Sequence, residues 1–163
     1  MRPPAAPTVS SLALSATGAQ GGTLNAGDVI TVTANMSEAT TVTGTPQMAL
    51  VIGGNTVQAN YAGGSGTNAL TFSYTILANQ TDANGISLPI NALTLNGGTL
   101  RDAVGNNATL ATAAVADSAN FKVYTTAAAA PTITTVADDV GSIITARFIK
   151  KRLGNRSRLY IGW

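Results

Sequence analysis

Apolar and polar side chains alternate with a period of two along much of the chain. The pattern is clearest at residues 69–76, where Leu70, Phe72, Tyr74 and Ile76 are separated by Thr and Ser. Successive side chains of a strand point to opposite faces, so this alternation indicates a half-buried β-strand. The same period predicts strands over residues 30–36, 48–52 and 57–61, and weaker rows predict strands over residues 8–14, 93–95, 99–101 and 121–125.

Clusters of Gly and Asn separate these rows, and such residues tolerate the positive φ of tight turns. Residues 53–55 (GGN) predict a hairpin, whereas residues 63–66 (GGSG) predict a longer loop. The Ala-rich residues 108–116 are interrupted by Thr and Val, so we expect a loop or edge strand there. Residues 127–130 precede a proline, which disfavours helix and indicates a linker. About seven to eight short strands with no helical stripe predict an all-β sandwich.

The amino-acid composition limits which metal sites and catalytic groups this chain can form. The 163 residues are 45% hydrophobic and 10% charged, and they include neither Cys nor His. Disulfides, thiolate or imidazole metal sites, cysteine nucleophiles and histidine-based triads are therefore excluded. The glycine clusters do not lead from a strand into a helix, so they predict no phosphate-binding loop. We expect no enzyme activity.

Charge is divided sharply along the chain. Residues 1–140 carry seven acidic and three basic side chains, whereas residues 141–163 carry six basic side chains and no acidic one. The cations of the basic tail, residues 142–163, are interleaved with Phe148, Tyr160 and Trp163. This pattern suits either a solvated end or a segment that binds nucleic acid or an anionic membrane. We expect no transmembrane segment, because no apolar run reaches the required length.

Loop oxygens supply the one candidate cofactor site. Calcium prefers carboxylate and carbonyl ligands, and the turn segments offer Asp82, Asn84, Asp102 and Asn106. The same residue types also close turns by accepting backbone N–H groups, and no bidentate Glu follows them. Two interpretations therefore stand side by side, a calcium site and a set of turn-closing side chains. An acid–base pair of Asp82 and Asp102 is disfavoured, because both occur in polar turns.

Several segments in order resemble the bacterial immunoglobulin-like repeats of giant surface adhesins and biofilm-associated proteins. The resemblance covers residues 7–126 and is carried by residues 24–33 (LNAGDVITVT), 37–46 (SEATTVTGTP), 69–74 (ALTFSY), 82–86 (DANGI) and 95–108 (LNGGTLRDAVGNNA). It implies a Greek-key sandwich of about seven strands that acts as a spacer in cell adhesion or biofilm formation. The implied location is extracellular or on the bacterial cell surface, with an export signal outside this chain. The alternative is a calcium- or glycan-binding module.

A second repeat is expected to begin near residue 131. Residues 131–136 (PTITTV) echo residues 7–12 (PTVSSL), which makes residues 127–141 a linker and the start of an incomplete next repeat. Composition changes again after residue 141, so the basic tail is expected to be no domain of its own and to come from a truncated or frame-shifted gene. The expected partners are neighbouring repeats and host or matrix surface glycans, with nucleic acid less favoured.

Overall fold

The computed structural model describes residues 5–125, which contain ten β-strands and no helix. The all-β class predicted from the sequence is confirmed. The strands are β1 (Val9–Thr17), β2 (Thr23–Leu24), β3 (Val29–Thr43), β4 (Gln47–Ile52), β5 (Asn55–Gly63), β6 (Thr67–Thr75), β7 (Thr81–Asp82), β8 (Leu93–Thr94), β9 (Thr99–Arg101) and β10 (Lys122–Tyr124). Every predicted row contains a strand, and the two-residue strands β2 and β7 were not predicted.

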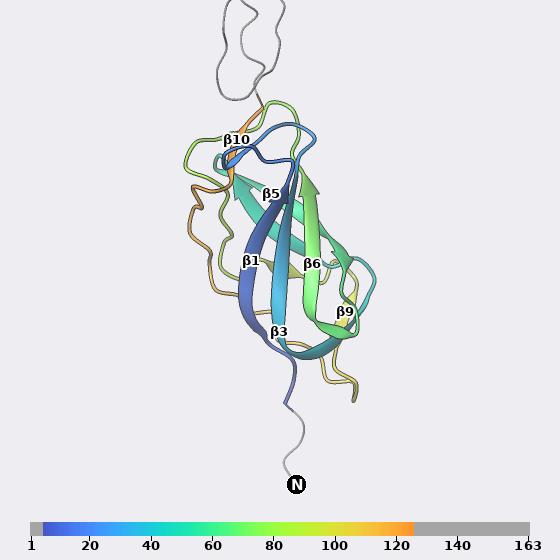
Figure 1. Cartoon of the computed structure of the whole chain (residues 1–163). Coiled ribbons are helices and arrows are strands. Elements are labelled where there is room, and N and C mark those ends of the chain that lie inside the picture. The colour runs from blue at the N-terminus through green and yellow to red at the C-terminus, as the bar shows by residue number, and fades with distance from the viewer. Residues whose placement is uncertain (1–4, 126–163) are drawn as a thin grey trace, which may run out of the picture. The chain divides into compact units, whose positions relative to one another are not determined.

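Two sheets form a sandwich-like arrangement within the described residues. The larger has the order β1-β3-β6-β5-β4-β8, its neighbours are antiparallel, and β9 joins it by pairing with β3 (Figure 1). The smaller has the order β2-β10-β7, with β10 parallel to β2 and antiparallel to β7. Segments distant in sequence therefore meet, since residues near 24, 82 and 123 share one small sheet.

Strand β3 is longer than its alternating row predicted. The row covers residues 30–36, whereas the strand has 15 residues and continues to Thr43. Its first half lies between β1 and β6, the β3–β6 register shifts between Asn35 and Thr40, and its last three residues pair with β9. Such irregularities bend a strand. The bend lets the first half of β3 pair with β1 and β6 while its end pairs with β9.

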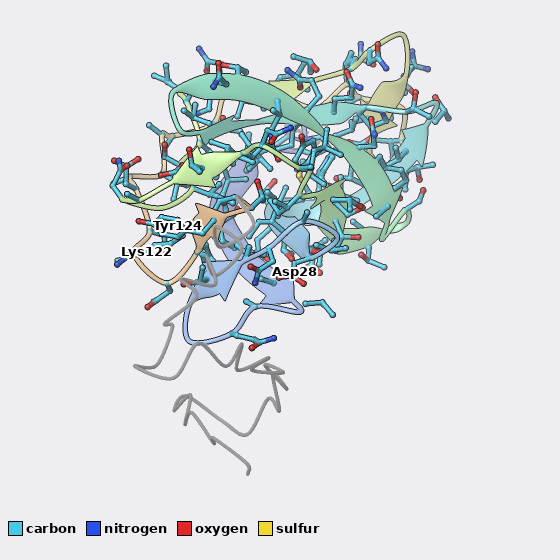
Figure 2. The ribbon with its side chains drawn as sticks, turned by 90° about the horizontal axis from the view of Figure 1, so that it is seen from above. Asp28, Lys122 and Tyr124 are labelled. Carbon is cyan, nitrogen blue, oxygen red and sulfur yellow. The ribbon has the colours of Figure 1, made fainter. Side chains whose placement is uncertain are left out.

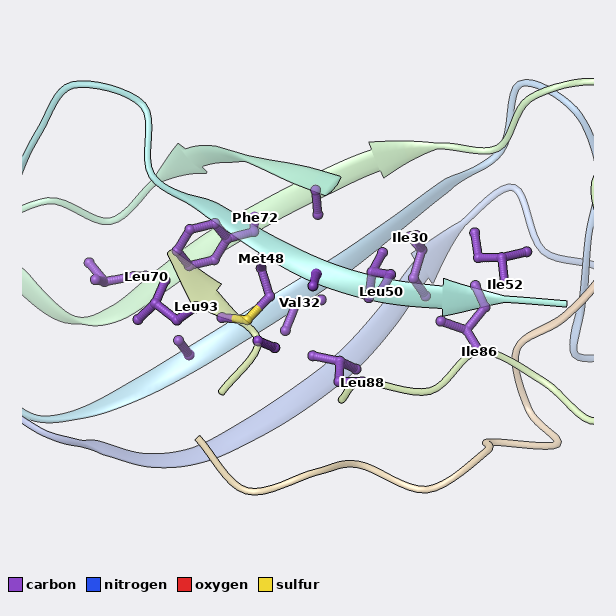
Figure 3. Close-up of a cluster of buried hydrophobic side chains, with 14 of the residues drawn as sticks. Ile30, Val32, Met48, Leu50, Ile52, Leu70, Phe72, Ile86, Leu88 and Leu93 are labelled. Atoms are coloured by element: carbon purple, nitrogen blue, oxygen red, sulfur yellow. The ribbon is translucent and has the colours of Figure 1, made fainter. Parts of the chain in front are cut away.

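The core lies on the inward face of the larger sheet. Phe72, Leu50 and Ile30 are fully buried, and Figure 3 shows them in one cluster of side chains that also includes Ile86 and Leu88. Alternate residues of β3 and β6 point inward, as their two-residue period predicted. No buried side-chain nitrogen or oxygen of the described residues lacks a hydrogen-bond partner.

Turns at the predicted Gly-rich segments connect the central strands. The hairpin at residues 53–54 joins β4 to β5 as expected. Of residues 63–66, Gly63 is the last residue of β5, and residues 64–66 connect it to β6, one residue more than the hairpin. The Ala-rich residues 108–116 form no helix. They are an extended segment with single bridges from Thr109 to Thr8 and from Val115 to Leu88. The predictions for residues 127–141 and 142–163 fall outside the described residues.

The described chain begins and ends at opposite poles of the larger sheet (Figure 1). At the N-terminal pole, which we define by Pro7 and the loop of residues 102–107, the Pro7 carbonyl accepts the Thr109 N–H at 2.8 Å. At the C-terminal pole, which we define by β2, β7 and β10, the chain leaves through β10. Figure 2 views the molecule from this pole and shows Asp28, Lys122 and Tyr124 there.

Candidate functional site

Asp82 closes a loop at the C-terminal pole. It is the last residue of β7 and its side chain is buried. Its Oδ1 atom accepts the Gly85 N–H and its Oδ2 atom accepts the Gly53 N–H, both at 2.8 Å. The carboxylate therefore joins the 82–85 turn to the tip of the β4–β5 hairpin.

Two glycines make this close approach possible. Gly53 has φ +57°, and a Cβ atom there would lie 2.0 Å from the Thr81 carbonyl oxygen. Gly85 has φ +104°, and a Cβ atom there would lie 1.9 Å from the Ser118 carbonyl oxygen. Neither position has space for a side chain, so both glycines are part of how Asp82 is positioned.

Asn84 forms a hydrogen bond with another segment. Its side-chain amide donates to Asp117, and both residues are exposed. Asn84 therefore acts here as a donor to a carboxylate.

Asp102 closes a second loop, directly after β9. Its Oδ1 atom accepts N–H groups from Val104 at 3.0 Å and Asn106 at 2.8 Å, and its Oδ2 atom accepts the Asn106 side-chain amide at 2.8 Å. Burial alone raises the pKa of Asp102, but the hydrogen bonds from Asn106, Val104 and Gly105 together lower it below its ordinary value. The structure thus stabilises Asp102 as a carboxylate that is surrounded by N–H donors.

The four predicted calcium ligands occupy two separate loops. Asp82 pairs with Val123 in the small sheet at the C-terminal pole, whereas Asp102 follows β9, which pairs with the end of β3 toward the other pole (Figure 1). Among residues 5–125, no three acidic, Cys or His side chains gather where they could hold a metal ion. In each loop the carboxylate oxygens are directed at N–H donors. The geometry matches the turn-closing interpretation of these residues.

The structure also separates the core aromatics from a surface one. Phe72 is fully buried and packs edge-on against Tyr61, with ring centroids 5.8 Å apart and an interplanar angle of 70°. Tyr124 is 45% exposed, whereas its neighbour Val123 is fully buried. Successive side chains of β10 point to opposite faces, which places Tyr124 outside and Val123 in the core.

A groove along β1 was not predicted from the sequence. It has a volume of about 300 Å³ and is lined by residues 9–12 of β1 and by residues 113–115 of the extended segment. Its walls consist of Val, Ser, Leu and Ala side chains and carry no charge. The groove follows the outer edge of β1, whose paired neighbour in the larger sheet is β3.

Comparisons with known proteins add no relative. Scans of family models, curated proteins and solved structures each found no match to this chain. The part of the chain that the structure describes contains no helix long and apolar enough to cross a membrane. The functional interpretation therefore depends on the residues and on the geometry above.

Proposed function

We propose that the chain is a structural repeat of a bacterial cell-surface or extracellular adhesin, with an immunoglobulin-like Greek-key fold, and that it acts as a spacer in cell adhesion or biofilm formation. Two lines support the proposal. One is the resemblance of residues 7–126 to such repeats, and the other is the path of the chain between the two poles. The proposed spacer role depends on the second line, the separation of the two ends of the described chain.

A spacer needs its two ends far apart. Chain termini of a domain often lie close together, and repeats linked through such ends would fold back on one another. Here β1 runs away from the N-terminal pole for nine residues, about 30 Å at roughly 3.3 Å per residue. The last described strand lies beside β2, beyond the far end of β1. Repeats joined in series would therefore extend in one direction.

The outward face of the larger sheet suits a passive, hydrated role. Rows across β1, β3 and β6 consist of small or hydroxyl-bearing residues, such as Ser15 beside Thr31 and Thr31 beside Ser73. Strands β1, β4, β5 and β6 contain no charged residue, and β3 contains one, Glu38. Hydroxyl groups keep such a face hydrated without providing an acid, a base or a nucleophile activated by one.

The proposed partners are neighbouring repeats in a longer protein. The described chain leaves at the C-terminal pole, and the sequence after the linker repeats the opening Pro-Thr of residues 7–8 at residues 131–132. An array built this way places the N-terminal pole of one repeat next to the C-terminal pole of the one before it.

Small-angle X-ray scattering of proteins with one, two and three copies of residues 7–130 in series tests the spacer role. We expect the maximum dimension to grow by at least about 30 Å per copy, since each copy adds the length of β1. A two-copy protein with a long Gly/Ser segment between the copies is the control, because a flexible joint broadens the distance distribution. An increment well below the length of β1 would contradict the proposal.

A further inference from the structure

The outer edge of β1 has no backbone partner among the described residues, although residues 113–115 flank its first four residues across a groove. In the part of the chain that the structure describes, no backbone hydrogen bond joins β1 to any segment other than β3. Natural sheets usually protect an edge with charge, proline, a bulge or a covering segment, because free N–H and C=O groups pair with other strands. β1 (VSSLALSAT) has no charge and no proline, and its one irregularity is the register shift near its start.

The opposite edge of the same sheet is protected. β8 has only two residues, and β4 beside it receives further backbone bonds, from the Ala49 N–H to Ala92 and from the Val51 N–H to Ser87. Within residues 5–125, the larger sheet therefore presents one long edge without backbone partners, at β1.

The sequence of this edge is palindromic. Residues 11–15 read Ser-Leu-Ala-Leu-Ser and are symmetric about Ala13. Ser11, Ala13 and Ser15 are exposed, whereas Leu12 and Leu14 are half-buried against the core. In an antiparallel pair of two such strands with Ala13 opposite Ala13, each Ser11 faces a Ser15 and each Leu12 faces a Leu14.

We propose that two copies of this chain associate through their β1 edges, in antiparallel register about a twofold axis at Ala13, so that the two larger sheets become continuous. A twofold interface uses the same patch on both subunits and must be self-complementary, and the palindrome satisfies this condition. Backbone hydrogen bonds supply the attraction, as in other cases where a strand adds to a sheet edge.

The groove beside residues 9–12 of β1 lies where the end of the partner strand would enter. Thr17 and Ser15 of the second copy lie opposite Val9 and Ser11 in this register, and these small residues meet a wall that includes Ala113. The half-exposed leucines gain apolar neighbours from the other copy. Two nine-residue strands bury less area than a standard interface, so the association is weak, with a Kd on the order of 0.1–1 mM. This inference does not depend on the spacer role.

Cross-linking of the full chain tests the register directly, since the native chain has no Cys. Ala13→Cys places two thiols face to face across the twofold axis, where directly opposed Cβ atoms lie about 4.5–5.5 Å apart. Thr33→Cys is the matched control, because Thr33 pairs with Ala13 on the same face but one strand in from the edge. Under mild oxidation we expect Ala13→Cys to form disulfide dimers at least about ten-fold faster than the control.

Charge variants test the same register without a covalent bond. The double variant S11K/S15K places Lys opposite Lys twice, and we expect it to raise the dimer Kd about ten-fold in sedimentation velocity. The double variant S11E/S15K places Glu opposite Lys twice and should dimerise at least as well as the native chain. Both variants replace Ser11, whose hydroxyl accepts the Asn35 amide at 3.0 Å, so a fold defect from that loss affects them equally.

Two outcomes would overturn the inference. One is a native chain that stays monomeric at about 1 mM while Ala13→Cys cross-links no faster than Thr33→Cys. The other is equal association of both charge variants with melting curves that show no loss of fold, which would place the contact elsewhere. Melting curves of the variants report any loss of fold. Neither outcome bears on the spacer proposal, which the scattering experiment tests.

Discussion

Asp82 and Asp102 perform the same physical task at opposite poles. Each is buried beside a turn and accepts N–H groups that the turn would otherwise leave unpaired. A buried N–H group without an acceptor costs about 1–3 kcal/mol, and the Gly85 N–H that Asp82 accepts is buried, so Asp82 stabilises its loop. Asp102 holds its own turn together through the hydrogen bonds from Val104 and Asn106. As long as these N–H groups donate to the carboxylate oxygens, the two aspartates have a structural role.

Asp102 should make stability depend on pH. Its pKa in the fold lies below the ordinary value of 3.8, so the unfolded chain binds this proton more readily. The contribution is complete above the unfolded pKa and is lost as the pH falls through the folded pKa. Between about pH 5 and pH 3 we expect the Tm, followed by circular dichroism, to fall more steeply in the native chain than in Asp102→Asn.

Glu38→Gln is the control for this experiment, since it removes one negative charge from a different segment. It should retain the steep acid dependence of the native chain. If Asp102→Asn falls as steeply as the native chain does, the carboxylate is not a main source of the acid sensitivity.

The hairpin between β4 and β5 depends on two glycines with different surroundings. Gly53 and Gly54 both have positive φ, of +57° and +80°, but only Gly53 lies against other backbone. In Gly54→Ala, holding an L-residue in the left-handed conformation costs about 1–2 kcal/mol of stability. Gly53→Ala adds a Cβ atom 2.0 Å from the Thr81 oxygen and displaces the N–H that Asp82 accepts.

We therefore expect Gly53→Ala to lower the free energy of unfolding by about 1–3 kcal/mol more than Gly54→Ala does. Urea titration of the two variants and the native chain measures the difference. Equal losses would mean that the hairpin tip moves freely and that its contact with Asp82 contributes little.

Elements with a repeating signal were predictable, and those without one were not. The rows of β3 and β6 alternate over several residues, and both were located from the sequence. A two-residue strand such as β7 has no period to detect, and it exists because β10 comes back beside it. The second half of β3 also escaped prediction, because Glu38 and Thr40 occupy inward positions there, so the apolar row ends at Met36 although the burial pattern continues.

The candidate site was predictable only in part, for a chemical reason. Asp-x-Asn-Gly at residues 82–85 is both the opening of an oxygen-ligand loop and a turn that a carboxylate closes on itself. Residue type does not separate the two, because calcium and backbone N–H groups seek the same oxygens. The distinction needs the distant donor Gly53, which the fold brings to Asp82. The palindrome at residues 11–15 was readable in the sequence, but its meaning required the free edge.

At the scale of the whole molecule, residues 7–126 should fold without the rest of the chain. Both ends of this segment are anchored within it: the Pro7 carbonyl accepts the Thr109 N–H at 2.8 Å, and the Thr125 hydroxyl donates to the Gln80 carbonyl at 2.7 Å. The buried hydrophobic residues of the core lie between Leu24 and Val123.

We expect one cooperative thermal transition with an enthalpy of about 80 kcal/mol, near 0.7 kcal/mol per residue, equal by calorimetry and by van't Hoff analysis. A protein of residues 9–126 lacks the Pro7 anchor and should melt at a lower temperature. A disordered far-UV circular dichroism spectrum for residues 7–126 would show instead that the fold depends on sequence outside them.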